Sequence, residues 1–222
     1  MTVLDPSARH LHCSIAYVGP PSAGKRTNIH FLHEATPARL RSAFFSVGVP
    51  FPLVGFYFSL PALGRIDGAE VCLHLSAVRG SEIGDEPRRQ LLRNVDAIVF
   101  VADAQRSGLE ANLEHWARMR ELLAERPRSV PVVLQYNKCD RPETMPSEEL
   151  DELLNPDALP RTLAVATEGS GVMATLKTVV KPLMVEIHAG RARRQPLEAA
   201  VPDDPLQLWQ LFRGDLPEKP SP

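Results

Sequence analysis

The sequence predicts an α/β fold, in which helices cover both faces of a mostly parallel six-stranded sheet. Short apolar runs alternate with helical patterns along the chain, which is typical of strand–helix–strand units. Residues 95–102 (VDAIVFVA) are almost entirely apolar, as expected of a strand buried on both faces. The chain has 222 residues, 44% of them hydrophobic, which is enough for one domain with a sizeable core.

The first half of the chain begins this alternation and then adds a hairpin. Residues 13–18 form a short apolar run, and the apolar residues of 26–35 recur at helical spacing. Residues 53–60 and 69–77 are two further strand-like runs. The segment between them contains Gly64 and Gly68, which supply the positive φ angles of a hairpin connection. These two strands are therefore expected to pair antiparallel.

The second half repeats the strand–helix unit, and right-handed crossovers then leave few alternative topologies. The expected elements after the strand at 95–102 are helices at 109–123, 147–154 and 171–188 and strands at 130–136 and 162–166. The charged positions Arg88, Arg89 and Arg93 indicate a further helix with a basic face, which is more typical of a solvated surface than of a binding patch.

The chain divides into three predicted regions. Residues 1–12 form a polar N-terminal lead that fits neither a signal peptide nor a transit sequence, residues 13–189 form the domain, and residues 190–222 form a Pro-rich C-terminal tail. The tail contains a dense apolar cluster around Trp209, which suggests docking either on this domain or on a partner.

Charge and cysteine content exclude several classes of function. Lys and Arg number 25 against 27 for Asp and Glu, so no overall field attracts nucleic acid or anionic lipid. No window approaches the length of a membrane span. Cys13, Cys72 and Cys139 lie far apart, as expected of reduced thiols in a cytoplasmic protein. The histidines show no metal-ligand spacing with these cysteines, and no metal site is predicted.

A phosphate-binding loop is predicted between the strand at 13–18 and the helix that follows it. The segment matches the signature GxxxxGK and consists of Gly19, Pro20, Pro21, Ser22, Ala23, Gly24 and Lys25. Loop N–H groups and the helix N-terminus form a concave anion site, and a lysine there supplies a point charge to the β- and γ-phosphates.

The position after this lysine departs from the signature. A Ser or Thr hydroxyl normally binds Mg²⁺ there, but this chain has Arg26. Thr27 comes next, but one residue along a helix rotates a side chain by roughly 100°, so its hydroxyl does not reach the same point. Arg26 either places positive charge where the cation would sit or points to solvent. Mg²⁺ binding is therefore not expected to be tight.

A guanine-recognition sequence follows the strand at 130–136. Asn137, Lys138 and Asp140 form an NKxD sequence at the carboxyl edge of the sheet, the edge that also carries the phosphate loop. A carboxylate at Asp140 accepts hydrogen bonds from both N1–H and the amine of guanine, whereas adenine has no hydrogen at N1. After the last strand, the backbone N–H of Ala166 or Thr167 is placed to reach guanine O6. The spacing predicts GTP or GDP as ligand.

At this point the chain resembles the Ras-like small GTPases, and within them the MglA-type bacterial polarity and gliding-motility GTPases. The resemblance rests on YVGPPSAGKRTN, FVADAQRSGLEANLEHW, QYNKCD and AVATEGSGVMATLKTV, and it extends to about residue 188. It implies a three-layer P-loop NTPase fold. It also implies a nucleotide-dependent switch that acts through protein partners, either a roadblock-type regulator or a polarity or motility effector.

The departures from this family concentrate where hydrolysis takes place. The family's Pro-Gly-Gln element is replaced here by a segment in which Gly80, Ser81 and Glu82 are weak catalytic candidates. Residues 42–52 offer no threonine to close over Mg²⁺, and only Arg39 and Arg41 are candidates for an intrinsic arginine. Since phosphoryl transfer is catalysed by positioning and charge, we expect a pseudo-GTPase with weak or absent hydrolysis. The alternatives are an active GTPase completed by a partner and a nucleotide-free interaction module whose pocket Arg26 fills.

Overall fold

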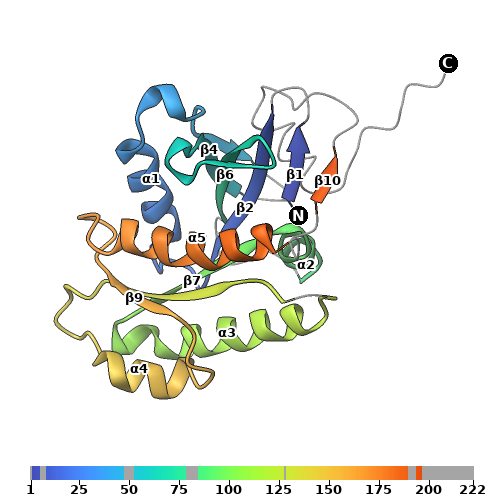
Figure 1. Cartoon of the computed structure of the whole chain (residues 1–222). Helices are drawn as coiled ribbons and strands as arrows, with labels where there is room; N and C mark the ends of the chain where they lie inside the picture. Colours follow the sequence, from blue (N-terminus) through green and yellow to red (C-terminus); the bar gives the residue numbers. More distant parts are fainter. Residues whose placement is uncertain are drawn as a thin grey trace.

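The computed structural model describes residues 2–5, 9–47, 53–78, 85–127, 129–189 and 194–196. Its helices are α1 Lys25–Ala35, α2 Asp85–Asn94, α3 Leu109–Ala124, α4 Ser147–Leu154 and α5 Val172–His188 (Figure 1). Its strands are β1 Thr2–Asp5, β2 His10–Val18, β3 Phe45–Val47, β4 Leu53–Ser59, β5 Arg65–Ile66, β6 Ala69–Val78, β7 Ala97–Asp103, β8 Val132–Asn137, β9 Arg161–Ala164 and β10 Arg194–Pro196.

The predicted strands all form, as β2, β4, β6, β7, β8 and β9. They lie in one sheet along the path β3-β4-β6-β2-β7-β8-β9. From β6 to β9 neighbouring strands run parallel, whereas β4 and β6 form the expected antiparallel hairpin. Asp67 and Gly68 lie at the tip of the short β5–β6 connection with φ of 51° and 81°, which confirms the expected positive φ angle at Gly68.

The sheet is larger than the sequence predicts. β1 pairs antiparallel with β2 and β10 pairs parallel with β1, although both come from segments expected to lie outside the domain, residues 1–12 and 190–222. Strands this short carry little local signal and take their conformation from pairing with neighbours. The rest of the tail, including Trp209, lies outside the described residues.

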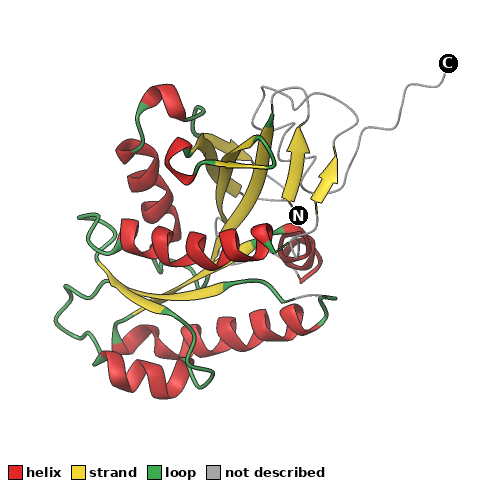
Figure 2. Ribbon diagram, viewed as in Figure 1, coloured by secondary structure: helices red, strands yellow, loops and turns green. Residues whose placement is uncertain are grey.

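The helices form a layer on each side of the sheet, which confirms the three-layer α/β fold (Figure 2). On one face α1 and α5 bury Ile29 and Val179 against the sheet. On the other face α2, α3 and α4 pack against β7 and β8 through a cluster that includes Leu92, Trp116 and Leu150. Among the described residues, no helix combines the length and the apolar character needed to cross a membrane.

The parallel register brings the predicted binding segments to one edge of the sheet. Asp103, Asn137 and Ala164 are the last residues of β7, β8 and β9, and the register aligns Asp103 with Asn137 and Asn137 with Ala164. The phosphate loop leaves the carboxyl end of β2 at this same edge. In open α/β sheets this edge is where ligands bind.

Candidate nucleotide-binding site

The phosphate loop has the tight backbone that its glycines predict. Gly19 has φ of 137°, and a Cβ added there would lie 2.1 Å from the Val101 carbonyl oxygen. Gly24 has φ of 101° and caps the N-terminus of α1, and a Cβ there would lie 2.1 Å from Asn137 Nδ2. Both positions therefore require glycine. The loop ends at the N-terminus of α1, where unpaired N–H groups favour an anion.

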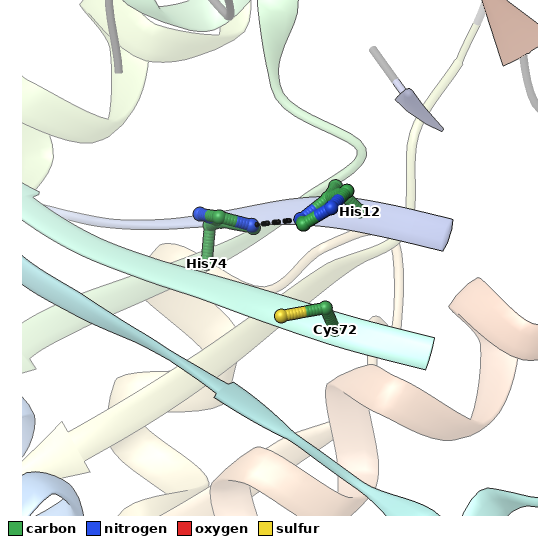
Figure 3. A group of neighbouring side chains, drawn as sticks. All are labelled: His12, Cys72 and His74. Atoms are coloured by element: carbon green, nitrogen blue, oxygen red, sulfur yellow. Dashed lines mark hydrogen bonds between the residues drawn. The ribbon is translucent and has the colours of Figure 1, made fainter. Parts of the chain in front are cut away.

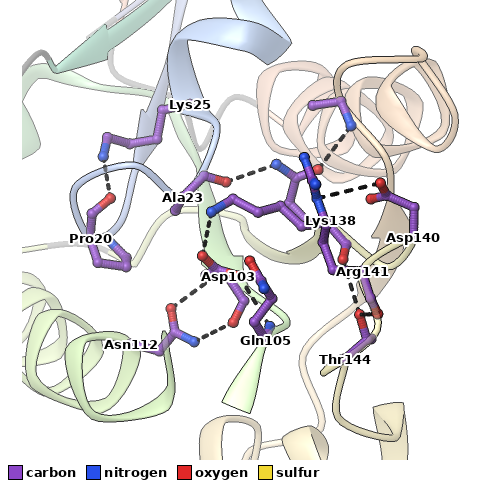
Figure 4. A network of polar contacts seen from close by, with 12 residues as sticks. Pro20, Ala23, Lys25, Asp103, Gln105, Asn112, Lys138, Asp140, Arg141 and Thr144 are labelled. Atoms are coloured by element: carbon purple, nitrogen blue, oxygen red, sulfur yellow. Dashed lines mark hydrogen bonds and ion pairs between the residues drawn. The ribbon is translucent and has the colours of Figure 1, made fainter. Parts of the chain in front are cut away.

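Lys25 ends this loop, and its ammonium group donates hydrogen bonds to backbone carbonyl oxygens. Its Nζ donates to the oxygens of Gly19 and Pro20 at 2.9 and 2.6 Å, and the residue is 6% exposed (Figure 4). Burial lowers the lysine pKa from its usual 10.5 to about 8, and the positive charge of Arg88 contributes. The two carbonyl dipoles compensate the lysine charge only in part, and a bound phosphate would compensate it in full.

Arg88 of α2 adds positive charge near the phosphate loop. Arg88 acts electrostatically on Lys25 and also on His115, whose pKa is lowered mainly by burial and further by Arg88 and Lys25. Arg89 instead pairs with Glu125 of α3 at 2.8 Å. The Arg89–Glu125 ion pair is solvent-exposed, so the prediction that this basic face is a solvated surface stays a prediction.

Asn137 joins the three predicted binding segments. Its Nδ2 donates to the Ala23 carbonyl oxygen at 2.8 Å and its Oδ1 accepts from the Ala166 N–H at 2.9 Å. The side chain is buried, with only 2% of the residue exposed. The Asn137 side chain therefore braces the phosphate loop. The N–H of Ala166 is already used by Asn137. Of the two residues expected to reach guanine O6, Thr167 is therefore the one whose N–H Asn137 does not use, and Thr167 is exposed.

Lys138 is positioned by an acidic partner on the neighbouring strand. Its ammonium group forms an ion pair with the Asp103 carboxylate (Figure 4). Asp103 is itself fixed, because its backbone N–H and carbonyl bond the Asn112 side chain at 3.0 and 2.7 Å and Oδ1 accepts from the Gln105 N–H. The sequence indicates only a structural role for Asp103. The ion pair becomes predictable only from the strand register, which aligns Asp103 with Asn137, the residue before Lys138.

Asp140 lies at the open side of the site. Its side chain is 35% exposed, and Oδ2 lies 3.6 Å from Nε of Arg141, a long contact that leaves the carboxylate available to a ligand. The loop is held by Thr144, whose hydroxyl donates to the Lys138 carbonyl oxygen at 3.1 Å. Asp140 is thus carried on an ordered turn directly after the buried strand β8.

The remaining predicted residues lie apart from this network or outside the described residues. Arg26 is exposed on the first turn of α1 and Thr27 is half-buried. Arg41 contacts the ring of His33 and donates to the His33 backbone carbonyl oxygen, and Arg39 is exposed. Gly80, Ser81 and Glu82, with residues 48–52, lie outside the described residues.

Replacing Asn137 by alanine is expected to lower the free energy of unfolding by about 2–4 kcal/mol. The change would leave two buried backbone groups, at Ala23 and Ala166, without their partner, and each such loss costs about 1–3 kcal/mol. Urea unfolding of the nucleotide-free protein measures it. Thr178→Ala on the exposed side of α5 is the control and should change stability by less than about 0.5 kcal/mol. Equal stability of the two variants would contradict the bracing role.

The sheet order, the phosphate loop after β2 and the NKxD turn after β8 together define a P-loop protein with a Ras-like small-GTPase fold. No family model matches the chain. A comparison with characterised proteins gives the Mutual gliding-motility protein MglA of Myxococcus xanthus (strain DK1622), which is 37% identical over 194 residues, covering 86% of this chain and all of that protein. The chain belongs to the MglA family of small GTPases.

Proposed function

We propose that this protein is a guanine-nucleotide-binding switch that acts through protein partners and hydrolyses GTP weakly or not at all. Membership of the MglA family supports guanine-nucleotide binding. The relative is named for gliding motility, and we extend that role to this chain as a component of a motility or polarity apparatus, with a roadblock-type regulator or a polarity effector as partner.

The observation that carries the proposal is the pair of bonds made by Asn137. They tie Ala23 of the phosphate loop to Ala166 after β9, so the segment that holds phosphate and the segments that read the base form one unit. Asp140 follows on the same turn with an accessible carboxylate. A carboxylate with two acceptor oxygens matches the two adjacent N–H donors of guanine and not the acceptor–donor edge of adenine.

Positive charge in the site supports binding that does not need a tightly held Mg²⁺. The chain has no hydroxyl at position 26, where Arg26 is exposed. Lys25 and Arg88 instead act on the same region, and each adds favourable charge for a diphosphate. Arg26 also replaces the hydroxyl that would hold Mg²⁺, and Mg²⁺ stabilises the transition state of hydrolysis. We therefore place this chain among the pseudo-GTPases.

The nucleotide content of the purified protein tests this proposal. We expect guanine nucleotides to be released on denaturation, and we expect added GTP to remain unhydrolysed over hours. Release of phosphate on many turnovers would overturn the pseudo-GTPase reading and favour an active enzyme. Absence of nucleotide, with no binding of GDP or GTP in a titration, would reduce the chain to an interaction module.

Binding of GDP is expected to take up a proton at pH 9. In the free protein the pKa of Lys25 is about 8, so the amine is mostly neutral at that pH, and a bound phosphate favours its charged form. Affinity should therefore fall as pH rises above about 8. Calorimetry in two buffers of different ionisation enthalpy should show close to one proton taken up at pH 9 and almost none at pH 7. Equal uptake at both would contradict a phosphate contact with Lys25.

A further inference from the structure

A second group of reactive side chains lies at the start of β2, away from the phosphate loop. The parallel register of β2 and β6 aligns His12 with Cys72 and Ser14 with His74. Alternate residues of a strand point to one face, so His12, Cys72 and His74 share a face of the sheet. Figure 3 shows the two imidazole rings next to each other, with the Cys72 thiol beside them.

These three side chains are close enough to bind one ion. One ring nitrogen from each histidine and the Cys72 sulfur all lie within 4.8 Å of one another. His12 Nδ1 and His74 Nε2 are already in hydrogen-bond contact at 2.7 Å. In a tetrahedral site with bonds of about 2.0–2.3 Å, the donor atoms are about 3.3–3.7 Å apart. Side-chain rotations that move these atoms by about 1 Å would therefore bring them to the separations that such a site needs.

The cluster is largely shielded from solvent. His12 and Cys72 are 3% and 2% exposed, and the Tyr57 ring stacks on His74 with centroids 5.2 Å apart. A neutral imidazole has one ring nitrogen with a lone pair that it can donate to a metal.

We propose that His12, Cys72 and His74 form a binding site for Zn²⁺ or a similar thiophilic divalent transition-metal ion. Two imidazoles and one thiolate are a donor set that zinc prefers, and three protein ligands leave a fourth position open. On binding, the Cys72 thiol gives its proton to solvent and forms the metal–sulfur bond. The proton shared by His12 and His74 moves to the other nitrogen of its own ring, so each ring offers one lone pair.

This site is separate from the nucleotide site. His12 and Gly19 are seven residues apart along an extended strand, and at about 3.3 Å per residue the distance is roughly 20 Å. The sequence shows no metal-ligand spacing between the histidines and the cysteines, but the fold brings these three side chains together. His12 and His74 are 62 positions apart, and only the β2–β6 pairing brings them together. The local signal is the Cys-x-His spacing on β6.

Metal titration of the full chain, prepared without a histidine tag, tests the proposal. Zinc competing with a chromophoric chelator should bind at one equivalent, and Cys72→Ser and His74→Ala should each weaken binding by about 100-fold or more. Cys139→Ser is the matched control and should leave affinity unchanged, because that partly buried thiol lies after β8 and contacts the Tyr136 carbonyl oxygen. Undiminished binding in the Cys72 and His74 variants would overturn the site.

Cobalt gives a second test that needs no variant. Bound Co²⁺ should show the intense visible bands of a tetrahedral ion and a thiolate charge-transfer band in the near ultraviolet. A spectrum like that of the aqueous ion would overturn the proposal. Saturating GDP should leave both results unchanged, since the two sites are separate, and the outcome does not depend on whether the protein binds nucleotide.

Discussion

Replacing Asp140 by asparagine should weaken GDP binding by about 100-fold or more. In the proposed site the carboxylate would offer two acceptor oxygens to guanine, whereas an amide would offer one acceptor and place an N–H against the guanine amine. Losing one charge-assisted hydrogen bond and creating a donor–donor contact costs about 3 kcal/mol, which is about 100-fold in affinity. Xanthosine diphosphate carries a carbonyl in place of that amine, so the variant should bind it better than the parent does.

Competition against a fluorescent guanosine diphosphate measures this change. Guanosine, xanthosine and adenosine diphosphates are compared on the parent, on Asp140→Asn and on Glu143→Gln. Glu143 lies in the same turn and is exposed, so its carboxylate-to-amide change is a matched control. An Asp140→Asn variant that keeps the parent's order of preference would show that Asp140 does not read the base.

Replacing Lys25 by methionine should lower the affinity for GDP and GTP by about 100-fold without unfolding the protein. In the proposed site the lysine would supply a charged donor to the phosphates, and each such hydrogen bond is worth about 1.5–3 kcal/mol. Stability should change by no more than about 1 kcal/mol, because the buried ammonium already carries a desolvation cost, as its lowered pKa of about 8 indicates. Methionine keeps the length of the buried stem.

Binding titrations and urea unfolding of the same variants separate these two effects. Arg26→Ala is the neighbouring control, and since Arg26 is exposed we expect at most a few-fold change in affinity. If Arg26→Ala weakened binding as much as Lys25→Met, the positive charge of the site would come from position 26 instead.

The sequence predicts the parts of this site that depend on local signals. A glycine-containing loop between an apolar strand and a helix is readable because its residues are contiguous and the backbone requires glycine at Gly19 and Gly24. Asn137 and Asp140 are predicted for the same reason, since the NKxD residues directly follow a buried strand. The order of the central strands follows from the handedness of parallel connections.

What the sequence does not predict is set by contacts between distant segments. The pairing of Lys138 with Asp103 depends on register between β7 and β8. The influence of Arg88 on Lys25 depends on how α2 packs. The strand β1 has four residues, and its conformation comes from pairing with β2 and β10. Each of these features depends on the tertiary arrangement and cannot be predicted from a local sequence pattern.

The central claim is that Lys25 and the phosphate loop, facing Asp140, bind a guanine diphosphate without a tightly held divalent ion. Calorimetric titration of nucleotide-free protein with GDP, in excess Mg²⁺ and in excess EDTA, tests it most directly. We expect saturable binding of one GDP in both conditions, with affinities that agree within about threefold, which is less than 1 kcal/mol. Binding that appears only with Mg²⁺, or in neither condition, would contradict it.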